Sequence, residues 1–459
     1  MSASKCNDAA RKKKSNKMRA QFCGDHFDGV YYIVKLRGVA SGLRGSLKFT
    51  WTFFLFASLL LNSGCALFFD KPVRHQITSS PVTGSPEFGR TTSALLDPAF
   101  VPGNNIKTLL NGDEIFPAML GAIRAAQHTI NLETYVFWKG HVARDFVAAL
   151  DERAKAGVKV NVILDALGTR RMGKENIKHL RESGVQVYIY HSLFGIDPRR
   201  YNYRTHRKLL IVDGNVAFIG GVGIADEWSG NGQGVKKYRD NQYVVTGPVV
   251  AQVQGAFISM WLKSTGDMLH GPDYFPALTN CGPYSVQTVS SSTWNGNLDF
   301  LYRLSIASAQ KTLRIENAYF VPDQLIRDEL IAAAKRGVKV EILVPGKLID
   351  SKLVRMASTS HYSELIKAGI KIYEYQLAML HVKLMIVDDC FVSVGSGNFD
   401  NRSTRLNAEA NINVLDKNFA AEQTALFEHD KAHSREVQLH DYDGLHPLNG
   451  IVNLLLPAL

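Results

Sequence analysis

Two stretches of the sequence carry side chains that could do chemistry, and both have the same design. The first runs from His206 to Gly221 and the second from His381 to Ser396, and without gaps they agree at seven of sixteen positions. Each begins with a histidine, followed by a lysine and then an aspartate at the same spacing. A purely structural repeat has no reason to keep an imidazole and an ammonium group at matching positions, because both are costly to bury. The repeat therefore predicts a reactive imidazole beside a fixed positive charge, twice.

Two such histidines suit the exchange of phosphodiesters. One imidazole attacks phosphorus and forms a phosphohistidine, while the other protonates the leaving alcohol and deprotonates the incoming one. Lys208 and Lys383 would hold the phosphoryl oxygens and offset the charge of the transition state. This chemistry needs neither a metal ion nor a cofactor, and the five cysteines have no metal-ligand spacing and suggest no disulfide framework. One active site between two related halves is predicted, for which a monomer suffices.

Both stretches are predicted to be β-hairpins. An apolar run rich in β-branched residues is followed by a turn at Asp213-Gly214 or Asp388-Asp389 and by a second apolar run. Residues two apart on a strand share a face, so each histidine is expected beside its lysine. Asp213 and Asp388 belong to the two predicted catalytic sets, but they are better interpreted as turn and buried-network residues than as direct participants.

The segments around the hairpins alternate between helix and strand patterns. In the first half, helices are predicted at 113–126, 142–156 and 174–183, and strands at 128–137, 158–165 and 185–190. The second half repeats the order, with helices at 297–309 and 323–335 and strands at 312–320 and 338–344. The alternation predicts an α/β fold with two similar α/β/α sandwich halves, mostly parallel sheets and one active site at their pseudo-twofold interface.

Composition divides the chain into five predicted segments. They are a basic leader (1–69), a linker rich in Pro, Ser and Thr (70–105), a first catalytic domain (106–270), a connector (271–296) and a second catalytic domain (297–459). The uncharged run at 49–69 is interpreted as a bacterial lipoprotein signal with Cys65 as the lipidated residue, as an uncleaved anchor, or as neither. The first two interpretations predict a catalytic part held at a membrane of the bacterial cell envelope, in the periplasm.

The charge distribution argues against nucleic acid as a partner. The chain has a net charge of +11, but residues 1–64 hold eleven Lys or Arg against three Asp, which leaves +3 for the remainder. The folded part therefore has no strong positive field. A phospholipid membrane and a lipid substrate are the expected partners.

The two motifs resemble the signature of the phospholipase D superfamily, His-x-Lys-x4-Asp followed after six residues by Gly-Ser-x-Asn. The second copy matches it fully through Gly395, Ser396 and Asn398, whereas Gly221 and Gly223 stand in the first copy where Ser and Asn are usual. The Gly-Gly variant and the residues around the motifs are similar to those of bacterial cardiolipin synthases.

The resemblance implies roles for individual residues. It implies that His206 is the nucleophile and His381 the acid and base, although the near-symmetry leaves the reverse assignment open. The residues that would bind the substrate phosphate or orient the histidines are Asn398, Ser396, Asp240 and Glu409. Ser396 and Ser403 could each donate a hydrogen bond to the phosphate, but turn capping explains both serines nearly as well.

The resemblance implies a phosphatidyl transferase, most closely one that joins two phosphatidylglycerol molecules into cardiolipin and glycerol. A phospholipase D that uses water and releases phosphatidic acid is the nearest alternative. A secreted nuclease is disfavoured by the weak charge, and a non-catalytic membrane scaffold is disfavoured by the two intact His-Lys pairs.

Overall fold

The computed structural model describes residues 75–192, 202–292 and 295–441. The predicted leader, including Cys65, lies outside these ranges, and so does the chain from residue 442 onward. All described residues belong to one compact unit. None of the helices in the described ranges is both long and apolar enough to cross a membrane.

The first half of the described chain alternates strands with helices. In chain order its elements are α2 (Pro86–Leu95), β1 (Val101–Leu110), α3 (Asn111–Ala125), β2 (Thr129–Thr134), α4 (His141–Lys155), β3 (Lys159–Asp165), α5 (Lys174–Glu182), β4 (Gln186–Tyr190), β5 (Leu209–Val212), β6 (Val216–Gly220), the 3-10 turn η2 (Asp226–Trp228), β7 (Tyr238–Arg239), β8 (Asn241–Thr246) and α6 (Val250–Thr265).

The second half repeats this order with additions. Its elements are β9 (Tyr284–Ser291), α7 (Asn297–Ser308), β10 (Thr312–Asn317), α8 (Gln324–Lys335), β11 (Lys339–Pro345), α9 (Lys352–Thr359), α10 (Tyr362–Lys367), β12 (Lys371–Tyr375), β13 (Met379–Leu380), β14 (Lys383–Val387), β15 (Phe391–Gly395), β16 (Glu409–Leu415), α11 (Lys417–Ala432) and β17 (Ser434–Glu436).

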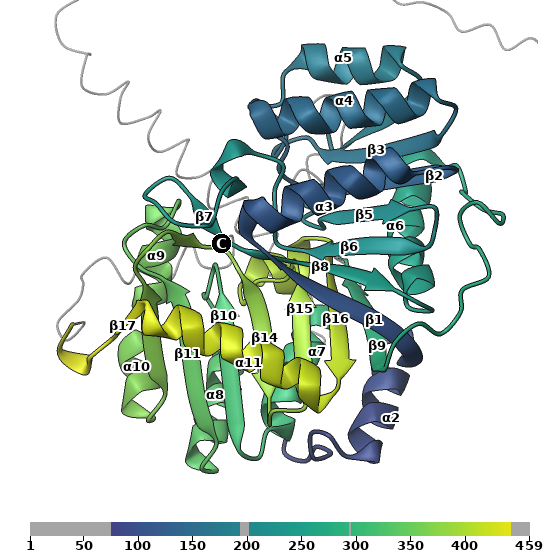
Figure 1. Cartoon of the computed structure of the whole chain (residues 1–459). Helices are drawn as coiled ribbons and strands as arrows, with labels where there is room; N and C mark the ends of the chain where they lie inside the picture. Colours follow the sequence, from purple (N-terminus) through teal and green to yellow (C-terminus); the bar gives the residue numbers. More distant parts are fainter. Residues whose placement is uncertain (1–74, 193–201, 293–294, 442–459) are drawn as a thin grey trace, which may run out of the picture. The chain divides into compact units, whose positions relative to one another are not determined.

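Fifteen strands form one continuous sheet, and its order exposes the internal symmetry. The order is β17-β12-β11-β10-β14-β15-β16-β9-β1-β8-β6-β5-β2-β3-β4. Outward from the junction of β9 with β1, each strand of one half has a counterpart in the other, and β17 is the only addition within this sheet of the described chain. The predicted α/β fold with two similar halves is confirmed, and Figure 1 shows β1 running between them.

The prediction of mostly parallel sheets is wrong. Within the large sheet only four neighbouring pairs are parallel, β2 with β3, β3 with β4, β10 with β11 and β11 with β12. The helical crossovers produce these pairs, whereas the motif hairpins and the strands beside them pair antiparallel. Strands and helices alternate only in the outer parts of the sheet, and only there are neighbouring strands parallel.

Both the predicted linker and the predicted connector contain regular structure. The linker includes helix α2, whose first turn is capped by Ser85 through a hydrogen bond from the Phe88 N–H to the serine hydroxyl (3.1 Å). The connector includes β9, which pairs with β1 on one side and β16 on the other. Strand β9 therefore comes wholly from the predicted connector, and β1 begins within the predicted linker and continues into the predicted first domain.

Three hydrophobic clusters hold the layers together. Helices α3 and α4 cover strands of the first half, as Figure 1 shows, and α7 and α8 cover strands of the second. The third cluster draws on both halves: Ile219 and Tyr243 from the first lie in it with Val394 and Ile412 from the second. Helices α6 and α11 add Phe257 and Phe427 to this shared core. Burial of apolar side chains therefore joins the halves as well as filling each one.

Candidate active site

The motif histidines stand at the start of two equivalent strands. His206 precedes β5 and His381 precedes β14, and these strands run antiparallel to β2 and β10. The start of each motif strand therefore lies at the carboxyl end of a parallel strand, the edge at which α/β sheets commonly carry their sites. Both histidines are buried, at 8% and 5% exposure.

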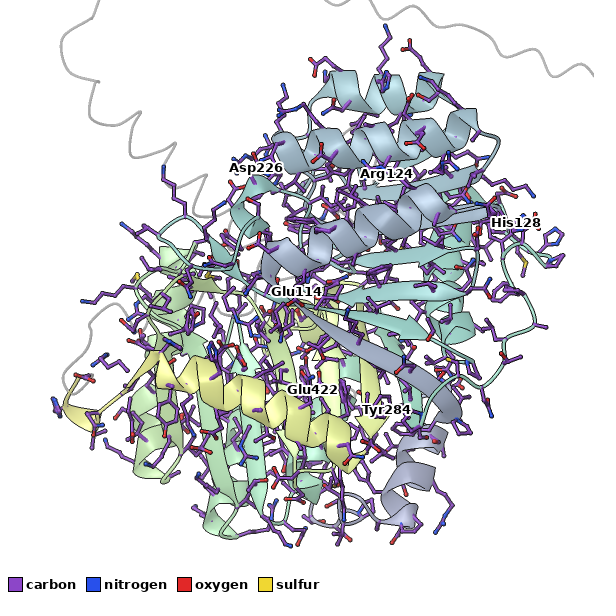
Figure 2. The ribbon with its side chains drawn as sticks, viewed as in Figure 1. Glu114, Arg124, His128, Asp226, Tyr284 and Glu422 are labelled. Atoms are coloured by element: carbon purple, nitrogen blue, oxygen red, sulfur yellow. The ribbon has the colours of Figure 1, made fainter. Side chains whose placement is uncertain are left out.

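The motif aspartates lie at the other ends of the same strands. Asp213 accepts hydrogen bonds from the N–H groups of Gln127 (2.9 Å), His128 (2.7 Å) and Thr129 (2.8 Å), and Asp388 accepts the equivalent three in the second half. Trp228 lines the pocket described below, and Asp226 lies two residues before it. Figure 2 shows that His128, which Asp213 contacts, lies far from Asp226. Both aspartates are half-buried. Because of these hydrogen bonds they hold the turns and the starts of β2 and β10, away from the histidines.

Both predicted turns are present and explain the aspartates further. Asp213 and Gly214 have φ of 50° and 60°, and Asp388 and Asp389 have φ of 50° and 52°. Two successive residues with positive φ make the tight turn that matches the twist of a hairpin. Asp adopts this conformation more readily than most residues because its carboxylate bonds to nearby backbone N–H groups.

Reciprocal backbone hydrogen bonds join the halves directly beside the histidines. The His206 N–H donates to the Ala408 carbonyl (2.9 Å), and the His381 N–H donates to the Arg239 carbonyl (2.7 Å). Strand β13, just before His381, pairs with β7, just before Asp240. Each histidine is therefore held against the segment of the other half that ends in its predicted carboxylate.

The two predicted orienting carboxylates serve the histidines across the interface. His206 Nδ1 lies 2.9 Å from both Glu409 oxygens, and His381 Nδ1 lies 2.7 Å from Asp240 Oδ2. A ring nitrogen that faces a carboxylate carries the proton, so the Nε2 of each ring keeps a lone pair. Each half supplies one imidazole and the partner carboxylate of the other imidazole.

Glu409 is held by hydroxyl groups. Ser396 Oγ donates to Glu409 Oε2 (2.6 Å), and Ser403 Oγ donates to Glu409 Oε1 (2.7 Å). Both hydroxyl groups donate to the carboxylate here, and a donation to the substrate phosphate stays a prediction. Their contribution is to position the carboxylate that orients His206.

Asp240 has a different support, which the sequence analysis missed. Trp228 Nε1 donates to Asp240 Oδ2 (2.9 Å), the oxygen that faces His381. A Cβ atom at Gly221 would come within 2.5 Å of Asp240 Oδ1, and one at Gly223 within 2.8 Å of Val136 Cβ and 3.0 Å of Trp228 Cζ3. The Asp240 carboxylate thus occupies the space of the missing serine, and the side chains of Val136 and Trp228 occupy that of the missing asparagine. The glycines at 221 and 223, where Ser and Asn are usual, were the sequence signal that other side chains fill these two positions.

The motif lysines stand next to their histidines, as predicted. Lys208 Nζ donates to the His206 carbonyl (2.6 Å), and Lys383 Nζ lies 2.8 Å from Nδ1 and 3.2 Å from Nε2 of His381. Burial is the main reason that the pKa of Lys208 falls to about 7 and that of Lys383 to about 8. An anion that enters the site would favour the protonated, charged forms of both lysines and so raise their pKa values again.

Burial also acts on the other ionisable groups. It is the largest cause of the low pKa of both histidines, about 4 for His206 and about 4 for His381. Burial alone would raise the pKa of Asp240, but His381 and Lys383 hold it below its usual value. Burial would likewise raise the pKa of Glu409, but His206 and Lys208 hold it below its usual value. The resting site therefore pairs neutral imidazoles with ionised carboxylates.

A pocket of about 290 Å³ opens over these groups. Its lining includes His206, Lys208, His381 and Asn398, together with aromatic rings and a rim of polar groups. Asn398 is 2% exposed, and no described residue donates a hydrogen bond to its Oδ1 atom. Its amide is thus a buried polar group that faces the pocket with unused capacity. The other lining residues that the sequence analysis did not single out include Tyr135, Trp138, Tyr238, Tyr319 and Asp350.

The described ranges contain no group of three or more His, Cys, Asp or Glu side chains arranged to hold a metal ion. The two cysteines that lie in the described ranges, Cys281 and Cys390, are unpaired thiols. The pocket lining presents both imidazoles, the Lys208 ammonium group and the Asn398 amide, together with two guanidinium groups and two carboxylates, those of Arg204, Arg402, Asp350 and Asp400.

Comparison with known proteins agrees with this geometry. The family model for the cardiolipin synthase PLD-like domain matches residues 119–261 and 302–431, one segment in each half. Cardiolipin synthase 2 of Bacillus cereus is 35% identical over 336 residues, which cover 72% of this chain and 65% of that protein. Cardiolipin synthase of Halalkalibacterium halodurans is 33% identical, with 74% and 68% covered. The chain thus spans slightly less than two thirds of the Bacillus cereus relative.

A solved structure shares the fold. Phosphatidylserine synthase of Haemophilus influenzae superposes with a TM-score of 0.59 at 15% identity, covering 80% of this chain and 96% of that one. Identity this low supports the architecture alone. With the match of the family model to both halves, the chain belongs to the phospholipase D-like family that includes the cardiolipin synthases.

Proposed function

We propose that this chain is a phosphatidyl transferase that works through a phosphohistidine and joins two phosphatidylglycerol molecules into cardiolipin and glycerol. One observation carries the proposal: a single pocket holds a buried imidazole from each half, and each imidazole is hydrogen-bonded to a carboxylate of the other half. The choice of lipid is supported by the names of the relatives, which are cardiolipin synthases.

In the first step, His206 Nε2 attacks the phosphorus of one phosphatidylglycerol. A P–N bond forms as the bond from phosphorus to the headgroup oxygen breaks, and glycerol leaves with a proton from His381. Bound phosphate favours the protonated form of His381, because its negative charge offsets the cost of burying an imidazolium. Glu409, 2.9 Å from His206 Nδ1, stabilises the charge that develops on the nucleophile.

In the second step, a headgroup hydroxyl of a second phosphatidylglycerol attacks the same phosphorus. His381 Nε2 accepts the hydroxyl proton, the new P–O bond forms and the P–N bond to His206 breaks. The product is cardiolipin, and both histidines return to their starting protonation states. Water in place of the second lipid would give phosphatidic acid by the same route.

Lys208, Lys383 and Asn398 bind the phosphoryl oxygens in both steps. The two ammonium groups offset the negative charge, and the Nδ2 group of Asn398, a residue of the pocket wall, is the amide donor to the phosphoryl oxygens. Groups fixed before the reaction stabilise a transition state without reorganising during it.

The test is mass spectrometry of the lipids formed when the purified full chain meets phosphatidylglycerol vesicles. We expect cardiolipin from the wild type and a loss of about a thousandfold or more in both His206→Ala and His381→Ala. Phosphatidic acid in place of cardiolipin would show that water is the acceptor. Absence of any lipid product from the wild type would overturn the proposal.

The roles of the two histidines are tested separately with phosphatidyl-p-nitrophenol, whose leaving group needs no acid. His381→Ala should release one burst of nitrophenolate and then stop with the phosphatidyl group on His206, because deprotonation of the second alcohol fails. His206→Ala should give no burst. The opposite pattern would make His381 the nucleophile.

We also propose that the segment before residue 70 holds the catalytic part at a membrane, outside the cytoplasm. The support is the basic, then apolar, composition of residues 1–69. Expression in a bacterium with labelled fatty acid should mark the wild type and not Cys65→Ser. Recovery of an unlabelled protein in the membrane fraction would favour the uncleaved anchor.

A further inference from the structure

A carboxylate at the rim of the pocket has no role in the steps above. Asp350 lies between β11 and α9, lines the pocket and is exposed. Its Oδ2 atom accepts hydrogen bonds from the hydroxyls of Tyr319 (2.7 Å) and Tyr238 (3.3 Å). Tyr238 comes from the first half and Tyr319 from the second, so both halves fix this carboxylate in place.

The two tyrosines assign Asp350 to one side of the pocket. The ring of Tyr238 lies 5.6 Å from the ring of His381, and the ring of Tyr319 lies 6.2 Å from it. The aromatic neighbour of His206 is a different residue, Tyr135, at 5.2 Å. Asp350 therefore belongs to the surroundings of His381.

The free capacity of this carboxylate indicates what it can bind. Both phenol hydrogen bonds end on Oδ2, and no described residue donates a hydrogen bond to Oδ1 or forms an ion pair with Asp350. A negative charge in this position repels a phosphate but accepts a hydrogen bond from an alcohol, and a bond to a charged acceptor is stronger than one between neutral groups. The exposed rim at Asp350 thus suits the alcohol, whereas the buried Lys383 beside His381 suits the phosphoryl group.

We propose that Asp350, Tyr238 and Tyr319 form a subsite for the hydroxyl adjacent to the reacting oxygen of the headgroup glycerol. The inference rests on the proposed function and deepens it. The leaving glycerol and the attacking headgroup of the second lipid are both 1,2-diols at the reacting carbon, so one subsite serves both steps. It also agrees with His381 as the group that moves the alcohol proton.

The test compares acceptors that differ by one hydroxyl. The full chain is given phosphatidylglycerol vesicles with equal concentrations of 1-propanol, 1,2-propanediol and ethanolamine, and the phosphatidyl products are compared by mass spectrometry. We expect the wild type to prefer the diol to 1-propanol by about tenfold. In Asp350→Ala this ratio should fall close to one.

The matched control is Asp273→Ala. Asp273 is a carboxylate in an exposed ion pair with Lys159 (2.9 Å), and its carbonyl accepts from Thr129 at the opposite end of the first-half strands. This variant should keep the wild-type product ratio. If Asp350→Ala does not fold, Tyr238→Phe combined with Tyr319→Phe keeps both rings and removes both phenol donors, and the ratio should fall there as well.

Three results would overturn the subsite: a wild type without preference for the diol, an Asp350→Ala variant with the wild-type ratio, or a preference for ethanolamine over the diol, which would indicate an ammonium site. The proposed function fails in a different way. In that case the vesicle assay without added alcohol gives no cardiolipin, while the diol preference among small acceptors persists.

Discussion

The indole of Trp228 donates to the same Asp240 oxygen that faces His381, so a change at this side chain should reach the imidazole. We expect Trp228→Phe to lower kcat about tenfold with little change in KM. The buried Asp240 carboxylate loses a hydrogen-bond donor, and the loss of such a bond costs about 1–3 kcal/mol. Without that donor Asp240 is a stronger base, so the pKa of His381 should rise in an NMR titration while that of His206 stays unchanged.

Trp138→Phe is the matched control for this change. Trp138 also lines the pocket and packs against Trp228 with ring centroids 6.1 Å apart, but its N–H donates to the Gly168 carbonyl (2.8 Å). The pKa of His381 should therefore stay at its wild-type value in Trp138→Phe. Equal shifts in both variants would mean that ring packing, and not the hydrogen bond, positions the histidine.

The pKa values of the site predict how activity depends on pH. Lys208 and Lys383, with pKa values of about 7 and about 8, lose their charge as pH rises through this range. The value of kcat/KM, which reports the free enzyme, already declines with pH because His381, the acid of the first step, has a pKa of about 4, and loss of the lysine charges should make the decline steeper between pH 7 and 9. The low pKa of His206, about 4, keeps the nucleophile unprotonated well below neutral pH. A profile that stays flat from pH 6 to 9 would contradict the role of the lysines.

At the scale of elements, the motif aspartates tie a hairpin turn to the start of a neighbouring strand. Asp388 accepts hydrogen bonds from three consecutive backbone N–H groups before and in β10. We expect Asp388→Asn to lower the free energy of unfolding by about 2 kcal/mol, because an amide cannot accept all three bonds. Urea unfolding followed by circular dichroism measures the difference.

The neighbouring Asp389 provides a control with the same substitution and nearly the same backbone conformation, φ of 52° against 50°. Its carboxylate is 55% exposed and pairs with Arg314 at 2.6 Å. Asp389→Asn should change the free energy of unfolding by less than about 1 kcal/mol, as is usual for exposed ion pairs. A cost equal to that of Asp388→Asn would show that the turn, and not the tie to β10, determines stability.

For the whole molecule, one buried arginine joins elements of both halves. The guanidinium of Arg207 donates to the carbonyls of Ala256 (2.8 Å) in the first half and of Ser291 (3.0 Å) and Glu409 (3.1 Å) in the second. We expect Arg207→Met to lower the free energy of unfolding by about 3–5 kcal/mol, because three buried carbonyls lose a charged donor. The measurement is again urea unfolding.

An exposed arginine gives the comparison. Arg435 is 47% exposed and pairs with Glu374 (3.0 Å) and Asp441 (2.7 Å). Arg435→Met should cost about 1 kcal/mol or less. Arg207→Met with an equally small cost would mean that the shared hydrophobic core alone holds the halves together.

Local sequence patterns were sufficient for the elements next to the motifs. The predicted helix at 113–126 is α3 and the predicted strand at 338–344 is β11, each displaced by at most two residues, because their apolar residues follow a clear period. Strands β1 and β9 were missed, since one begins Val-Pro-Gly and the other is rich in Ser, Thr and Gln. They are strands because other strands pair with them on both sides, which no local pattern records.

The sequence by itself determined which groups could react: two histidines, each two residues before a lysine, are repeated at matching positions, and repetition is visible without a structure. Only the tertiary structure decided how these groups are combined. Asp240 lies 141 residues from His381 and Glu409 lies 203 residues from His206, so each partnership depends on how the halves pack against each other. The same holds for the contact of Trp228 with the His381 ring and for that of Asp350 with Tyr238, each between distant segments. Side chains that meet through packing have no characteristic separation in the sequence, so only the folded structure shows that they are neighbours.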